Sequence, residues 1–202
     1  MTAPRKKKTA PSPPRLARDD WLDAAFNAAV EGGFDAVRVL SLAQTLGVTR
    51  GSFYWHFTDH AELLAALLAR WRDRELESGR ALKLDPNKSP QAELERILDF
   101  ALAHAGADLE NMRFELALRG LGRRDPAVAH MLAEVDQNRL KLFEHRFERL
   151  TGDAKSAVDL AALFYLAIVG SYQALARPNN PPQLESYLKG LIAQYVIRRP
   201  SA

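Results

Sequence analysis

Helical periodicity is the feature of this 202-residue chain that most limits its fold. From Asp19 onward nearly every segment repeats its apolar residues at intervals of three and four, and no convincing run alternates apolar with polar residues as a strand would. The first such face is formed by Leu22, Ala25, Phe26, Ala29 and Val30. The pattern predicts an all-α protein.

Turn residues divide this pattern into segments. Gly32 and Gly33 should end the first helix, Gly47 should end a short second helix, and Asp59 is placed to cap the helix that follows it. The stretch 79–90 is the richest internal run of turn residues and indicates a domain boundary close to it. Further helices are expected at about 94–105, 114–121, 128–150, 155–175 and 182–196.

Basic residues are concentrated at the N-terminus. Residues 1–18 carry six basic and no acidic side chains, so the net charge of +3 becomes −3 for the remaining residues. Four prolines in the same stretch argue against packed structure there. We expect residues 1–18 to be a disordered basic arm of the kind that often binds nucleic acid, with a passive solubilising tail as the alternative.

Composition excludes several classes of protein. The sequence has no cysteine, which rules out disulfides, thiolate catalysis and the common zinc-finger ligand sets. The longest apolar run, residues 160–170, is shorter than the roughly 20 residues of a membrane-spanning helix, and we expect a cytoplasmic protein. His56 and His60 straddle an expected helix break and do not form a metal pair. Nothing indicates an enzyme, a cofactor or a metal site.

Residues 33–64 predict a helix-turn-helix, with a tight turn at 47–49 and a second short helix at 50–57. Helical spacing directs Val48, Phe53 and Phe57 toward the core of this unit. The residues left outward or partly outward are Arg50, Gly51, Ser52, Tyr54, Trp55 and His56. Exposed Tyr and Trp side chains that can form hydrogen bonds suit contacts with DNA phosphates and base edges.

This stretch resembles the TetR family of transcriptional regulators. The matching residues are Gly33-Phe34, Leu42-Ala43, Gly47-Val48-Thr49, Gly51-Ser52-Phe53-Tyr54, His56-Phe57 and Glu62-Leu63-Leu64. The resemblance covers about residues 19–70, and it implies a homodimer that binds a palindromic DNA operator. Residues 19–75 would be the three-helix DNA-binding domain, and residues 76–202 the helical domain for dimerisation and an unknown small-molecule effector.

The resemblance also assigns candidate DNA contacts. They are Thr49, Arg50, Gly51, Ser52, Tyr54, Trp55, His56 and His60. Thr49 would cap the recognition helix and touch a phosphate, while Arg50, Ser52 and Trp55 would face base edges. Tyr54 and His56 would contact the backbone or neighbouring bases, and Gly51 would let the protein backbone approach. His60 stands where the family usually has a lysine that contacts phosphate.

The charge of the helix-turn-helix leaves a second function open. Residues 19–64 hold two basic and seven acidic side chains, a net of −5, which is unusual for a DNA-binding surface. The basic arm would compensate. The alternative is a helical, dimeric small-molecule-binding protein without sequence-specific DNA binding, and an enzyme built on a helical bundle ranks below both.

The last two helices predict the dimer. The segment 160–170 is apolar nearly all round and must be covered, either inside one chain or between two subunits. The final helix adds an apolar stripe of Leu184, Leu188, Leu191, Ile192 and Tyr195. We expect a four-helix bundle across a two-fold axis.

Polar residues beside apolar stripes are weak candidates for an effector site. They are His104, Asn138, Tyr165 and Tyr172, each of which could instead be a satisfied core residue. Arg119, Arg123 and Arg124 are expected to lie in a solvated turn.

Overall fold

The computed structural model describes residues 16–81, 87–102, 107–175 and 183–198, and within these ranges the chain is helical and contains no strand. The helices are α1 (Arg18–Gly32), α2 (Val39–Thr45), α3 (Arg50–Phe53), α4 (His60–Ala81), α5 (Pro90–Ala101), α6 (Ala107–Gly122), α7 (Pro126–Thr151), α8 (Ala154–Leu175) and α9 (Gln183–Ile192). A 3-10 turn, η1 (Phe34–Ala36), follows α1, and a π-helical turn, η2 (Ala193–Ile197), continues α9. The all-α prediction is confirmed. Residues 1–15 of the predicted basic arm lie outside the described residues, whereas Arg18, its predicted last residue, begins α1 and is helical.

The helix ends follow the turn chemistry of the sequence. Gly33 and Gly47 adopt φ values of 72° and 66°, which side-chain-bearing residues rarely adopt, so α1 and α2 end where the sequence indicates. The Asp59 carboxylate accepts a hydrogen bond from the Glu62 amide at 2.8 Å, which confirms the predicted cap of α4. At α7 the Asp125 side chain accepts from two amides directly after it.

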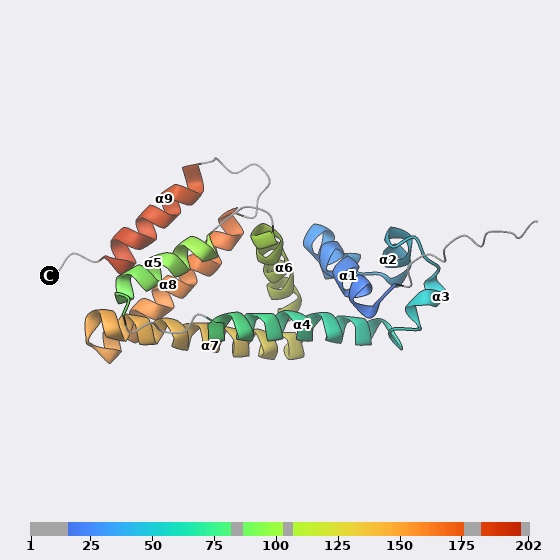
Figure 1. The fold of residues 1–202 in the computed structure, drawn as a ribbon, viewed down its shortest axis with the longest axis horizontal. Coiled ribbons are helices and arrows are strands. Elements are labelled where there is room, and N and C mark those ends of the chain that lie inside the picture. Colours follow the sequence, from blue (N-terminus) through green and yellow to red (C-terminus); the bar gives the residue numbers. More distant parts are fainter. Residues whose placement is uncertain (1–15, 82–86, 103–106, 176–182, 199–202) are drawn as a thin grey trace, which may run out of the picture.

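Two groups of helices occupy the two ends of an elongated molecule (Figure 1). Helices α1 to α3 form one end, and α5, α8 and α9 form the other. The long helices α4 and α7 pack against each other and connect the two ends. Helix α6 lies between the two end groups. Because α4 starts directly after the recognition turn and reaches the second group, it physically links the two parts.

Two apolar cores match these ends. The first joins Trp21, Phe53 and Phe57 of the helix-turn-helix to Phe114 of α6 and to the first half of α7. The second joins α5, the second half of α7, α8 and α9. Since α4 is continuous from His60 to Ala81, the division expected between residues 75 and 76 falls inside a helix. The two cores meet along α6 and α7.

Helix α8 is buried on one face only. Its side chains Ala161, Phe164 and Ile168 pack in the second core, whereas Leu163 and Leu166 are exposed, the latter to 66%. By length and composition alone, residues 154–173 of α8 could cross a membrane, although the apolar run 160–170 in the sequence is too short to predict a spanning helix. The packing of one face against α7 is that of a core helix, and the opposite apolar face remains uncovered in the single chain.

Candidate functional site

The recognition turn is held by backbone hydrogen bonds. The Val48 amide donates to the Ala43 carbonyl at 2.9 Å across the turn that contains Gly47. Regular helix α3 is shorter than expected and ends at Phe53, but hydrogen-bonded turns continue it to Phe57. A segment this short has little stability alone, so its orientation depends on the side chains it buries.

This helical segment has one buried face and one exposed face, as the sequence predicts. Phe53 is fully buried and packs edge-on against Trp21, with ring centroids 5.3 Å apart. The ring of Phe57 stacks on that of Phe53, with centroids 5.4 Å apart. Tyr54 and Trp55 are exposed to 51% and 84%. The predicted outward orientation of both aromatic residues is confirmed. Two large aromatic side chains exposed side by side are uncommon on a monomer surface without a partner.

The remaining candidates of the turn lie on the same surface. Thr49 occupies the position before α3, but its side chain makes no capping hydrogen bond, so the predicted cap is wrong; no described residue forms a hydrogen bond with its hydroxyl. The Arg50 guanidinium donates to the Tyr54 hydroxyl at 3.1 Å, which orients both side chains. Gly51 is exposed, while Ser52 and His56 are half-buried. Leu16 shares a shallow depression with these residues, so the chain that leads to the basic arm lies beside the recognition turn.

His60 is the candidate that the structure engages elsewhere. Its Nε2 lies 2.6 Å from the Val37 carbonyl oxygen, which joins the start of α4 to the turn before α2. The ring therefore has an internal structural partner. A contact of His60 with a DNA phosphate stays a prediction.

Two arginines outside the counted window offset acidic side chains of the helix-turn-helix. Arg18 pairs with Glu62 at 2.9 Å, and Arg70 pairs with Asp23 at 2.7 Å. Both arginines lie outside the window 19–64 in which the net charge of −5 was counted. Hydrogen bonds from Thr58 and Arg18 lower the pKa of Glu62. The counted charge thus overstates the field that DNA would meet.

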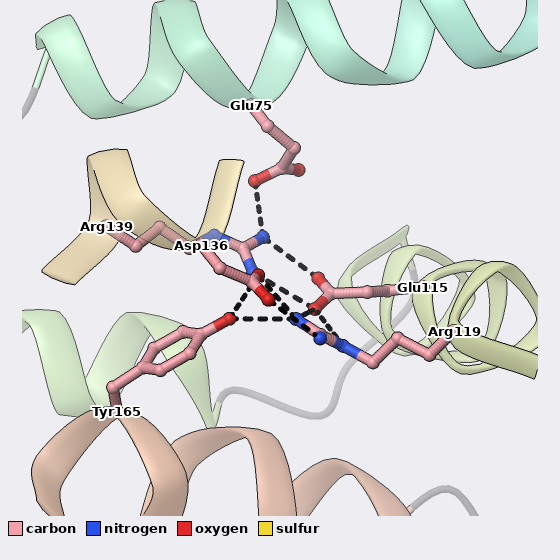
Figure 2. A network of polar contacts seen from close by, with 6 residues as sticks. All are labelled: Glu75, Glu115, Arg119, Asp136, Arg139 and Tyr165. Atoms are coloured by element: carbon pink, nitrogen blue, oxygen red, sulfur yellow. Dashed lines mark hydrogen bonds and ion pairs between the residues drawn. The ribbon is translucent and has the colours of Figure 1, made fainter. Parts of the chain in front are cut away.

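A polar network lies between the two ends of the molecule (Figure 2). Arg139 of α7 donates to Glu75 of α4 at 2.7 Å and to both carboxylate oxygens of Glu115 of α6 at 2.9 and 3.0 Å. Arg119 of α6 forms a bidentate pair with Asp136 at 2.8 and 3.1 Å. The prediction that Arg119 lies in a solvated turn is wrong, because i, i+4 spacing places it beside Glu115 and the fold brings α7 against it.

The carboxylate and guanidinium groups of the network keep one another ionised. Burial raises the pKa of Glu115, but Arg139 and Arg119 outweigh it, so the pKa of this carboxyl is lowered. Burial opposes the charge of Arg119, yet Asp136 and Glu115 hold its pKa above the usual value. Tyr165 donates to Asp136 and accepts from Arg119, and burial together with the Asp136 contact raises its pKa to about 12. Tyr165 is therefore a neutral hydrogen-bonding member.

A cavity of about 430 Å³ adjoins this network between α4, α5, α7 and α8. Asn138, Tyr165 and Tyr172, three of the four weak effector candidates, line it together. The fourth, His104, lies outside the described residues. Sequence reasoning missed Glu75, because an acidic side chain on the linking helix has no local pattern that distinguishes it from a solvated one.

The comparisons with known proteins match this geometry. The family described as "Bacterial regulatory proteins, tetR family" matches residues 22–67. The chain is 34% identical to the HTH-type transcriptional regulator SrpR of Pseudomonas putida over 187 residues, which cover 82% of this chain and 87% of SrpR. It is 32% identical to the tetracycline repressor protein class D of Escherichia coli, but this match covers only 50% of each chain.

A solved structure shows the same fold. A transcriptional regulator from Rhodococcus sp. Rha1 superimposes with a TM-score of 0.73 and 19% identity, over 91% of this chain and 97% of that one. The match to SrpR covers more than four fifths of both chains, and the family match at residues 22–67 covers the helix-turn-helix itself. The chain therefore belongs to the TetR family of bacterial regulatory proteins.

Proposed function

We propose that this protein is a DNA-binding transcriptional regulator that recognises an operator through α3 and the turns after it. The observation that carries the proposal is the opposite exposure of neighbouring aromatic residues. Phe53 is fully buried, whereas Tyr54 and Trp55 are exposed in the same segment as Arg50 and the Thr49 hydroxyl, with which no described residue forms a hydrogen bond. These groups can donate to phosphates and base edges and can stack on apolar parts of bases.

The protein acts as a homodimer through the outward face of α8 and α9. The exposed large apolar side chains here are Leu163 and Leu166 of α8, Tyr187 of α9 and Tyr195 of η2. A second copy of the chain can cover them symmetrically, because an isologous interface presents the same patch twice. Four helices then form the bundle, and the two recognition turns become related by a two-fold axis, as in a palindromic operator.

The basic arm adds phosphate contacts. Leu16 lies beside Thr49 and Trp55, so the arm, which carries five basic residues before Leu16, is attached at the edge of the proposed DNA surface. Sequence-independent attraction of this kind compensates for the modest charge of the helix-turn-helix. A regulator of this type works in the cytoplasm, where the DNA is.

The cavity makes the regulator responsive to a small molecule. Glu75 and Ser78 of α4 line it, and α4 starts immediately after the recognition turn. A ligand with different affinities for two positions of α4 would shift the spacing of the recognition helices in a dimer. We propose repression that the ligand relieves, and the half-length match to a protein named a tetracycline repressor supports this direction.

Selection of DNA fragments tests the proposal. Sheared genomic DNA of the source organism is passed over immobilised full-length protein at physiological salt, and the retained fragments are sequenced. We expect a few loci that share an inverted repeat. A retained pool no different from the input would contradict the proposal and would favour the small-molecule-binding protein without sequence-specific DNA binding.

A further inference from the structure

The cavity next to the polar network carries a negative charge. Three carboxylates, Glu75, Glu115 and Asp136, meet two guanidinium groups, so one negative charge remains. Glu134, an exposed residue that also lines the cavity, adds a second at its rim. A site with this balance favours a positively charged ligand and opposes an anion.

The described guanidinium group of the lining is not available to an anion. Arg139 donates to both oxygens of Glu115 and to one oxygen of Glu75. Contacts with Glu115 and Glu75 hold the pKa of Arg139 above its usual value, although burial opposes its charge. An anionic ligand would have to displace one of these carboxylates and leave it without its partner, which is costly in a partly buried position.

Glu75 and Tyr172 each present to the cavity a polar atom with which no described residue forms a hydrogen bond. Only one carboxylate oxygen of Glu75, Oε2, has a hydrogen-bond partner among the described residues, and its side chain remains 22% exposed. None of the described residues forms a hydrogen bond with the Tyr172 hydroxyl, although the ring lines the same cavity. Burial raises the pKa of Tyr172, so the hydroxyl stays neutral and offers its oxygen as an acceptor.

Most of the remaining lining is apolar, and it includes several aromatic rings. Phe100, Phe143 and Tyr172 line the cavity with Ile97, Leu142 and Ile168. Aromatic faces attract cations as well as apolar groups. The volume of about 430 Å³ lies in the range of sites for small organic ligands. The walls therefore suit a phenylalkyl or similar body.

We propose that the effector of this protein is an organic cation with an apolar body, whose charged group lies between the free oxygen of Glu75 and the Tyr172 hydroxyl. This inference names the ligand class of the effector site and rests on the proposed function. A cation at Glu75 competes with Arg139, whose ion pair with Glu75 joins α7 to α4. Occupation of the site thus loosens the attachment of the helix that leads from the recognition turn.

Calorimetric titration of full-length protein with three matched probes tests the ligand class. The probes are cationic phenylbutylammonium, neutral phenylbutanol and anionic phenylbutyrate, each at physiological salt so that surface attraction is screened. We expect the cation to bind at least about tenfold more tightly than the alcohol, because a charge-assisted contact contributes at that level. Phenylbutyrate should bind most weakly.

A variant pair locates the charge. Glu75→Gln should weaken binding of the cation about tenfold and leave phenylbutanol within about twofold, since it removes the charge and keeps the shape. Glu77→Gln, on the same helix but exposed and outside the cavity lining, should change neither. Phenylbutanol binding shows that the cavity of the variant is intact. Equal or tighter binding of the anion, no binding of the cation, or equal cation binding by Glu75→Gln would overturn the proposal.

Failure of this inference is distinguishable from failure of the proposed function. Operator binding is measured on ligand-free protein, whereas the titrations use no DNA. A protein that selects an operator but binds phenylbutyrate best would keep the function and lose the ligand class. A protein that binds the cation through Glu75 but selects no DNA would keep the ligand class and lose the regulator. Added cation should weaken operator binding of the wild type, and unchanged operator affinity would contradict the link through α4.

Discussion

Phe53→Ala and Trp55→Ala change two aromatic residues of one helical turn, and the structure predicts opposite consequences for them. Phe53 is fully buried, with ring contacts to Trp21, Tyr54 and Phe57 at centroid distances of 5.3 to 5.4 Å. Its truncation should lower the free energy of unfolding by about 3–5 kcal/mol. Trp55 is 84% exposed, so its truncation should change that free energy by less than about 0.5 kcal/mol.

Operator affinity should respond differently from stability: Trp55→Ala, which should stay as stable as the wild type, should bind the operator more weakly than the wild type does. Trp55→Ala removes a group of the proposed DNA surface and should weaken operator binding by about 1–3 kcal/mol per half-site. Urea denaturation followed by circular dichroism gives the stability, and fluorescence anisotropy with a labelled, selected operator gives the affinity. If Trp55→Ala loses as much stability as Phe53→Ala, or keeps full operator affinity, the assignment of the outward face to DNA is refuted.

Three further changes address the arm, the dimer and the network. Deleting residues 2–15 removes five basic side chains per chain, ten per dimer; if half of them bind phosphates, the slope of log affinity against log salt should shrink by about 4 to 5, and equal slopes would show a passive tail. Leu166→Glu places a charge on the exposed face of α8 and should give folded monomers in light scattering, so a persistent dimer would place the interface elsewhere. Glu115→Gln should lower the free energy of unfolding by about 1–3 kcal/mol at neutral pH, because it removes the carboxylate that pairs with both Arg119 and Arg139 and leaves them only Asp136 and Glu75. The lowered pKa of Glu115 means that its stabilisation is complete above the ordinary glutamate value of about 4.3 and is lost as the pH falls through the lower folded value, so a penalty that does not shrink in acid would contradict this role.

Local signals made the helix-turn-helix predictable. Gly33 and Gly47 end helices because their backbone conformations suit glycine, and Asp59 caps α4 through a hydrogen bond within one turn. The inward and outward faces of residues 50–57 follow from helical spacing alone. All of these depend on contacts between residues close in sequence or on a single periodicity.

Long-range packing made the rest unpredictable. Arg119 has the local composition of a solvated turn, and only the arrival of α7 gives it Asp136 as a partner. The apolar run 160–170 has no polar side to mark which face turns inward. Ile168 proves to be buried within the chain, while Leu166, two residues away, is exposed. The lining of the cavity was predicted only in part, because Glu75 comes from α4, the helix that connects the two ends of the molecule.

Footprinting of the selected operator tests the central claim most directly. The protein should act as a two-fold dimer whose recognition turns enter successive major grooves. Hydroxyl-radical cleavage should therefore reveal two symmetric protected half-sites whose centres are separated by about one helical turn, or a multiple of it. Trp55→Ala should lose both half-sites at the same protein concentration. A single unsymmetrical protected stretch, or protection that Trp55→Ala leaves unchanged, would contradict recognition through α3 of a symmetric dimer.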